Sequence, residues 1–142
     1  MKRTATAVWT GTLKEGSGKL STLSGAIKDQ PYTHRMRFVD ETGTSGTNPE
    51  ELIAAAHAGC FAMQLSAFLA DNGTPATELK ATAAVELIPG TGITGSALTL
   101  EARVPGIDQE KFEELARKAK AECPVSRALG AIKVTLEARL AG

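Results

Sequence analysis

The sequence lacks a net charge and is poor in aromatic residues. Its 142 residues include 16 basic and 16 acidic side chains, but only one Trp, one Tyr and four Phe. A chain without an excess of either sign has no electrostatic field that favours nucleic acid or an anionic membrane. We therefore expect its partner to be a small molecule or a second copy of the chain. With so few aromatics, Ala, Leu, Val and Ile must fill most of the core.

The sequence also lacks the pattern of a secretion signal. Lys2 and Arg3 are positively charged, but no apolar segment follows them as a signal peptide requires. The apolar run at residues 52–70 is long enough to raise the question of a membrane span. It contains His57, Gln64 and several alanines, which insert weakly, so a core or interface helix is the better prediction. We expect a soluble cytoplasmic protein that does not bind a membrane.

Patterns typical of metal and nucleotide sites are absent from the sequence. The two cysteines and two histidines are scattered without the spacing of a metal site. The paired glycines at residues 16–18 and 90–92 belong to turns, and no phosphate-binding loop joins a strand to a helix. We therefore predict neither a metal site nor a nucleotide-binding loop.

The hydrophobic pattern predicts a single α+β domain over residues 1–142. At this length one core is expected, with little room for a second. Alternating polar and apolar residues indicate strands, and apolar residues at helical spacing indicate helices. Strands are predicted at residues 4–12, 19–23, 34–39, 78–88, 93–104 and 131–140, and helices at 48–71, 108–122 and, as a short turn, 125–129. The order β-β-β-α-β-β-α-β implies antiparallel sheets, each with a face for the helices to cover.

We expect the helix at residues 48–71 to organise the chain. Asn48 is a favourable N-cap, and Glu51 lies at the reach-back position of a capping box. Beyond its first turn the helix is apolar on every side, which is more than so small a domain covers alone. We therefore predict a homodimer that buries this helix.

Cys60 lies in the middle of the same helix, and Cys123 lies far along the chain. A lone cysteine is most often a small buried hydrophobe. Small neighbours of Cys60, such as Gly59 and Ala62, leave space beside its sulfur. Cys123 precedes Pro124 at a predicted helix start, where amide donors favour a thiolate. Two such cysteines in a cytoplasmic protein indicate function more than a structural disulfide.

A reactive thiol needs a neighbouring cation, because an unperturbed thiol has a pKa of about 8.5 and is mostly protonated. Arg35 and Arg37, on one face of the predicted strand at residues 34–39, are the candidates. Glu50 either complements the helix N-terminus or orients that arginine. Glu50 and Cys60 are separated by about 15 Å along a straight helix. One substrate contacts both only if the helix bends or a second subunit folds over it.

Two other functions remain open from the residues alone. His57 lies one turn before Cys60, so a Cys–His hydrolase or acyl-transfer dyad is geometrically allowed. The simpler interpretation of His57 is an interface histidine with satisfied hydrogen bonds. Alternatively, the chain is a non-catalytic dimeric binding protein in which both cysteines are merely buried.

Five short motifs, spread over nearly the whole chain, are specific enough to indicate a family. They are Asn-Pro-Glu-Glu-Leu-Ile at residues 48–53, Ala-Ala-His-Ala-Gly-Cys-Phe at 55–61, Glu-Cys-Pro-Val-Ser at 122–126, Val-Trp-Thr-Gly at 8–11 and Gln-Pro-Tyr at 30–32. This set resembles the osmotically inducible protein C (OsmC) and organic hydroperoxide resistance (Ohr) family. The resemblance implies an intertwined homodimer with active sites at the subunit interface. It also implies a thiol-dependent peroxidase of stress defence that reduces organic hydroperoxides and hydrogen peroxide.

The resemblance assigns roles to four residues. Cys60 resembles the peroxidatic cysteine, and Cys123 resembles the resolving cysteine that closes a disulfide with it. Glu50 resembles the carboxylate that holds the active-site arginine, and Arg37 resembles that arginine in the OsmC branch, with Arg35 as a nearby competitor. An external thiol reductant is implied, and no metal, haem or flavin.

The first hairpin bears on the branch of the family. The Ohr branch takes its arginine from this hairpin, where the present chain has Lys14 and Lys19 and no arginine. The resemblance therefore favours the OsmC branch.

Overall fold

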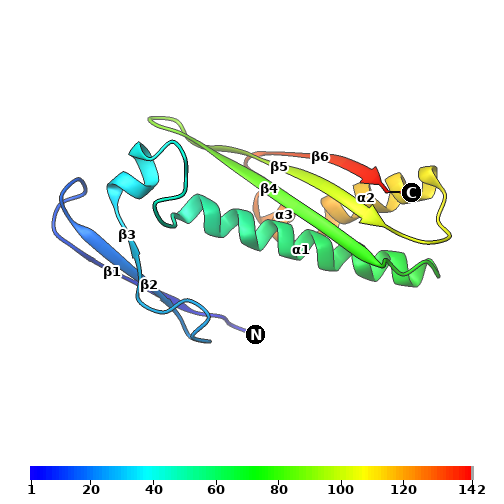
Figure 1. The fold of residues 1–142 in the computed structure, drawn as a ribbon, viewed down its shortest axis with the longest axis horizontal. Coiled ribbons are helices and arrows are strands. Elements are labelled where there is room, and N and C mark those ends of the chain that lie inside the picture. Colours follow the sequence, from blue (N-terminus) through cyan, green and yellow to red (C-terminus); the bar gives the residue numbers. More distant parts are fainter. Residues whose placement is uncertain (142) are drawn as a thin grey trace. The chain divides into compact units, whose positions relative to one another are not determined.

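The computed structural model describes residues 1–141, which form two compact units. The first unit is Met1–Leu52, and the second begins at Ile53. Figure 1 labels their helices and strands. The predicted α+β class is confirmed, because two three-stranded sheets are accompanied by helices.

The first unit contains an antiparallel sheet made of β1 (Ala5–Thr10), β2 (Ser17–Thr22) and β3 (Gln30–Tyr32) in that order. Gly18 of β2 lies opposite both Trp9 and Tyr32. Because position 18 has no side chain, the two rings meet over it with centroids 5.3 Å apart. A Cβ at this position would lie only 2.6 Å from Trp9 Cε3. The aromatic pair therefore depends on glycine at this position.

The strand predicted at residues 34–39 is wrong. The segment forms a π-helical turn, η1 (Arg35–Val39), and the third strand lies just before it in β3. Thr33 begins the turn: its carbonyl accepts from the Arg37 N–H at 3.2 Å, and its hydroxyl accepts from the Met36 N–H at 3.3 Å. An alternation of six residues is too short to exclude one helical turn, so this local cap decides the structure. Arg35 and Arg37 consequently do not share the face of a strand.

The central helix α1 (Pro49–Asp71) is confirmed at both ends. The Asn48 side chain accepts from the Glu51 N–H at 2.8 Å, as expected of an N-cap. The Glu51 carboxylate accepts from the Thr47 hydroxyl at 2.8 Å, rather than from the Asn48 N–H that the predicted capping box requires. Gly73, with a φ of 80°, lies just beyond the last turn, where only glycine adopts the left-handed conformation without strain.

The second unit contains a mixed sheet, whereas the sequence predicted antiparallel pairing throughout. β4 (Glu78–Ile88) and β5 (Gly92–Arg103) form the predicted antiparallel hairpin. β6 (Lys133–Leu140) instead pairs with β5 in parallel. The helices between β5 and β6 return the chain to the beginning of β5, and a strand that starts there runs in the same direction. Residue patterns identify strands but do not fix their direction.

Two helices lie between β5 and β6 in the sequence, α2 (Gln109–Glu122) and the short α3 (Pro124–Ala128). Asp108 caps α2 by accepting from the Lys111 N–H at 2.8 Å, as predicted. Helices α1 and α2 pack on the sheet of this unit (Figure 1). The core between them is made of almost fully buried side chains from α1, β5 and α2: Phe61, Leu65, Leu69, Leu98, Leu100, Ala102, Phe112, Ala116 and Ala119.

Within the single chain, helix α1 is buried on one face only, in line with the prediction that so small a domain does not cover it alone. His57, Phe61, Leu65 and Leu69 recur every four residues and are fully buried. The exposed residues of α1 are mostly small or apolar: Ala55, Ala56, Gly59, Met63, Ser66, Ala67 and Ala70. By length and composition α1 could cross a membrane, since its mean hydropathy reaches 1.6 over 18 residues, of which 22% are buried. The regular buried stripe is nevertheless what a core helix of a folded domain presents.

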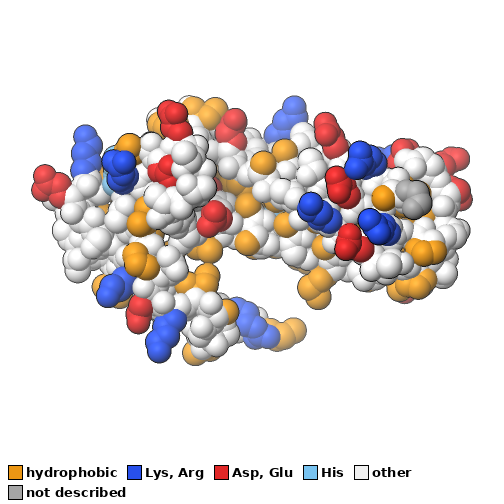
Figure 2. Space-filling model, viewed as in Figure 1, with side chains coloured by type: hydrophobic (Ala, Val, Ile, Leu, Met, Phe, Trp, Pro, Cys, Tyr) orange, Lys and Arg blue, Asp and Glu red, His pale blue; other side chains and the backbone are white. Residues whose placement is uncertain are grey.

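Charged side chains of both signs are mixed on the surface of the second unit. Figure 2 shows Lys and Arg side chains next to Asp and Glu side chains at the end of this unit where β6 and α2 lie. Arg139 pairs with Glu101 at 3.3 Å across the sheet. On the face shown, positive and negative side chains are therefore mixed locally, as well as equal in number over the whole chain.

Candidate active site

Two cysteines from distant parts of the sequence lie together in the second unit. Cys60 is half-buried in the middle of α1, and Cys123 is fully buried between α2 and α3. Both are free, and Cys60 packs against the buried cluster that contains Cys123, close enough for Cys123 to raise the pKa of Cys60. The backbone of Cys123 is fixed, because its N–H donates to the Ala119 carbonyl at 2.9 Å and its carbonyl accepts from the Arg127 N–H at 3.0 Å. Removal of two electrons from such a dithiol gives a disulfide.

The surroundings of Cys60 favour its protonated form. Burial is the largest cause that raises the pKa of Cys60, and the hydrogen bond with Cys123 raises it further. The backbone N–H of Val125, in the first turn of α3, contacts the sulfur and lowers the pKa. From the sequence we expected a cation next to this thiol. Among the described residues, none of the groups that shift the pKa of Cys60 is a cation.

Arg37 and Glu50 form a forked ion pair in the first unit. Arg37 Nε donates to Glu50 Oε1 at 3.1 Å and to Oε2 at 3.3 Å, while Nη2 donates to Oε1 at 2.8 Å. Glu50 is only 7% exposed. Arg35, the competing candidate, is exposed. The predicted contact between an arginine and Glu50 is therefore present, and Arg37 is the arginine that makes it.

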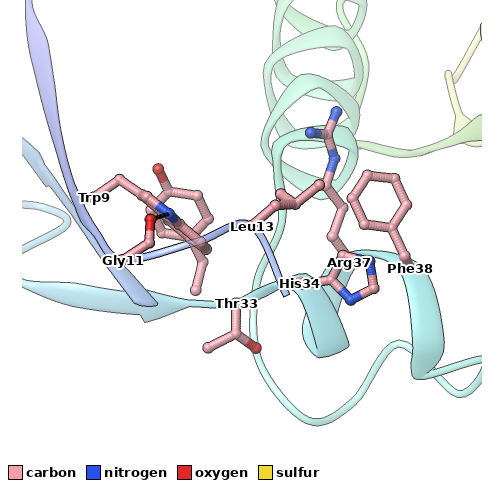
Figure 3. Close-up of a pocket in the computed structure, with 8 residues that line it drawn as sticks. Trp9, Gly11, Leu13, Thr33, His34, Arg37 and Phe38 are labelled. Atoms are coloured by element: carbon pink, nitrogen blue, oxygen red, sulfur yellow. Dashed lines mark hydrogen bonds between the residues drawn. The ribbon is translucent and has the colours of Figure 1, made fainter. Parts of the chain in front are cut away.

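A cavity of about 460 Å³ opens beside this pair in the first unit. It is lined mainly by aromatic and apolar side chains, with Thr33, His34 and Arg37 as the polar or charged exceptions. Figure 3 shows the His34 and Phe38 rings side by side, with the Arg37 guanidinium directed toward the start of α1. The guanidinium carbon also lies 5.0 Å from the centre of the Phe38 ring. A cavity of this kind suits a small apolar group attached to a polar one.

His57 is fully buried, and both of its ring nitrogens have partners. Nδ1 shares a hydrogen bond with Ser96 Oγ at 2.6 Å, and Nε2 shares one with Ser126 Oγ at 2.7 Å. Burial lowers the pKa of His57, so the ring is neutral near pH 7. With both nitrogens occupied, the ring has no free base to offer Cys60. The hydrogen bonds expected of His57 are confirmed, but the ring is buried inside the second unit, whereas the sequence predicted it at an interface. The Cys–His dyad loses its geometric basis.

The residues that hold His57 were missed by sequence reasoning. Ser96 in β5 lies in no motif, and Ser126 in α3 is the last residue of the motif at residues 122–126, but neither was given a role. One signal was available for Ser126, because it follows Cys123 by three residues just as His57 precedes Cys60 by three.

An α+β chain that holds two free thiols against each other belongs to the class of dithiol proteins. A family model described as "OsmC-like protein" matches residues 41–137. The chain is 47% identical over 137 residues to the protein named peroxiredoxin OsmC of Escherichia coli (strain K12), which covers 94% of this chain and 93% of that protein. This chain belongs to the OsmC family.

Relatives named for hydroperoxide resistance are also similar. The organic hydroperoxide resistance protein OhrA of Bacillus subtilis (strain 168) is 40% identical over 112 residues, covering 75% of this chain and 74% of that protein. The crystal structure of OhrB from Bacillus subtilis matches with a TM-score of 0.67 at 27% identity, covering 96% of this chain and 98% of that one. The match to the OsmC relative is closer and longer than that to OhrA, in line with the OsmC branch favoured by the sequence.

Proposed function

We propose that the chain is a thiol-dependent peroxidase that reduces organic hydroperoxides to alcohols. The observation that carries this function is the pair of free thiols of Cys60 and Cys123 next to each other in the core of the second unit. Family membership supports it, since similar proteins are named peroxiredoxin and organic hydroperoxide resistance protein. Such an activity defends a cell against oxidative stress.

The reaction balances with the two thiols as the electron source. The Cys60 thiolate attacks the distal oxygen of ROOH, the O–O bond breaks, and the alkoxide takes a proton to leave as ROH. Cys60 becomes a sulfenic acid. The Cys123 thiol then attacks that sulfur and forms the disulfide, and the hydroxyl leaves as water. An external dithiol reduces the disulfide by exchange and returns both cysteines to thiols.

Arg37 is the cation proposed for this chemistry. A guanidinium stays charged at every relevant pH and directs several N–H groups, so it stabilises both the Cys60 thiolate and the developing alkoxide. Glu50 fixes the direction of that guanidinium through the forked contact. The cavity beside Arg37 would take the organic part of the hydroperoxide.

The proposed working form is a cytoplasmic homodimer in which each chain acts as one functional domain. We assign the exposed Ala-, Gly- and Met-containing face of α1 to the interface, because the single chain leaves this long apolar face uncovered. In this arrangement the Arg37–Glu50 pair reaches Cys60 at the interface, and the cation that the immediate surroundings of Cys60 do not supply is provided there.

Thiol titration tests the proposed function. One equivalent of cumene hydroperoxide should remove both thiols per chain, and DTT should restore them. Cys123→Ser should still reduce one equivalent but then stop without a disulfide. A hydrolase that uses Cys60 and His57 would keep full turnover in Cys123→Ser, and a binding protein would keep two titratable thiols. Repeating the titration with hydrogen peroxide gives the substrate preference.

A further inference from the structure

Besides the contact between the two thiols, a second contact joins the helical turns next to Cys60 and Cys123. The proposed peroxidase chemistry does not use this second contact. On α1, His57 and Cys60 are three residues apart and share a face. At the start of α3, its N-cap residue Cys123 and Ser126 are also three apart. His57 meets Ser126 at 2.7 Å, and Cys60 meets Cys123. The turn of α1 from His57 to Cys60 therefore contacts the start of α3 at two points.

The histidine contact is costly to break because everything in it is buried. His57 is 0% exposed, Ser96 1% and Ser126 8%. Neutral imidazole has one donor and one acceptor nitrogen, and a serine hydroxyl serves either, so both ring nitrogens are satisfied in either tautomer. Removing one hydroxyl leaves a ring nitrogen without a partner in the interior, and a buried polar group without a partner destabilises that geometry.

Helix α3 depends on such contacts for its position. It has five residues, too few to be a stable helix without tertiary packing. Cys123 is its N-cap residue, and its first turn carries the Val125 N–H that contacts Cys60 and the Ser126 hydroxyl. Loosening α3 therefore moves the resolving thiol away from the sulfur it must attack.

We propose that Ser126, through its hydrogen bond with His57, is a positioning residue that keeps the Cys123 thiol against Cys60. The inference rests on the proposed peroxidase function. The Cys60 sulfenic acid has two fates. Attack by the Cys123 thiol forms the S–S bond and releases water, whereas a second hydroperoxide transfers an oxygen to the sulfur, giving sulfinic acid and ROH. The Ser126–His57 contact favours the first fate.

Two serine variants separate positioning from stability. Ser126→Ala and Ser96→Ala each remove one buried hydrogen bond to the same ring, and should lower the melting temperature by similar amounts. Only Ser126 lies on the element that carries Cys123. The fraction of chains converted to sulfinic acid per turnover of cumene hydroperoxide, read by intact mass, should rise about fivefold in Ser126→Ala, as loss of one hydrogen bond implies. It should stay at the wild-type value in Ser96→Ala, and the rate of sulfenic acid formation should not change in either variant.

The outcomes distinguish a failure of this inference from a failure of the proposed peroxidase function. A wild-type sulfinic fraction in Ser126→Ala, or an equal rise in Ser96→Ala, overturns the positioning role while leaving the peroxidase intact. Absence of a disulfide in the wild-type chain overturns the peroxidase itself. Should Ser126→Ala fail to fold, the isosteric pair Ser126→Thr and Ser126→Val replaces it. The threonine variant keeps the hydroxyl and should resolve as wild type, whereas the valine variant should over-oxidise.

Discussion

Arg37 binds Glu50 through two of its nitrogens, with Nη2 at 2.8 Å and Nε at 3.1 Å from the same carboxylate oxygen. A contact through two nitrogens fixes the plane of the guanidinium as well as its distance. Because Glu50 is buried at the first turn of α1, that plane is fixed relative to the start of the helix. The arginine is therefore pre-oriented before any substrate arrives, which is the condition for stabilising a developing charge at little cost.

Glu50→Gln should lower kcat/KM for organic hydroperoxide by about a hundredfold, the scale that a misplacement of a reacting group by an ångström produces. The amide retains one oxygen for Arg37 but loses the charge and the forked geometry. Steady-state peroxidase assays with DTT as reductant measure the effect. Glu51→Gln is the matched control. Glu51 is the next residue of the same turn and is exposed, so this variant should keep wild-type activity. Equal losses in the two variants would mean that only the helix start has been weakened.

Arg37→Met should shift the pH dependence of Cys60 reactivity upward. Burial and the contact with Cys123 both raise the pKa of Cys60, so without the proposed cation the thiolate should form only above the ordinary thiol value of about 8.5. Below that pH the thiol is protonated and unreactive, and the rate rises as the pH increases through the pKa. The rate of Cys60 alkylation by iodoacetamide against pH, in a Cys123→Ser background, measures the midpoint. Arg35→Met, at an exposed position two residues away, should leave it unchanged.

The site could be predicted from the sequence where a residue type has few alternative uses. Cys60, Cys123 and Glu50 lie in short motifs, and the family resemblance of those motifs, rather than the charge of Glu50 alone, predicted its contact with an arginine. The segment that carries Arg37 was predicted as a strand from six alternating residues. It forms a helical turn instead, because the hydrogen bonds of Thr33 outweigh that short alternation. Ser96 could not be found from the sequence, and the spacing of Ser126 from Cys123 gave no role by itself, since both roles come from the tertiary fold that brings these serines to His57.

The fold was predicted in its elements more than in its pairing. The hairpin of β4 and β5 follows from alternation around a Pro-Gly turn, and the structure agrees with it closely. The parallel pairing of β6 with β5 depends on where α2 and α3 deliver the chain, which is a property of packing. The same holds for α1: its apolar character is local, whereas the face that it buries is set by the sheet and α2.

The buried, neutral His57 should make the protein less stable in acid. Its pKa is lowered from 6.5 in the folded chain, so the unfolded chain binds a proton at a higher pH than the folded chain does. The free energy of unfolding should therefore decrease as the pH falls below 6.5, by at most about 1.4 kcal/mol per pH unit, and level off below the folded pKa. Urea denaturation at several pH values between 5 and 8 measures the slope. His57→Gln, which does not titrate, should be less stable but should lose this part of the slope; an unchanged slope would assign it to other groups.

Met63→Lys should convert the proposed homodimer into monomers. Met63 is 77% exposed in the chain and lies on the apolar face of α1, so a lysine there costs little in a monomer but buries a charge at the proposed interface. Sedimentation velocity measures the mass, and peroxidase activity should fall together with the dimer if the interface completes the site. Ile88→Lys, at a side chain 41% exposed by the turn between β4 and β5, introduces the same charge away from α1 and should remain dimeric. A Met63→Lys dimer with full activity would show that this face of α1 is free in the working protein.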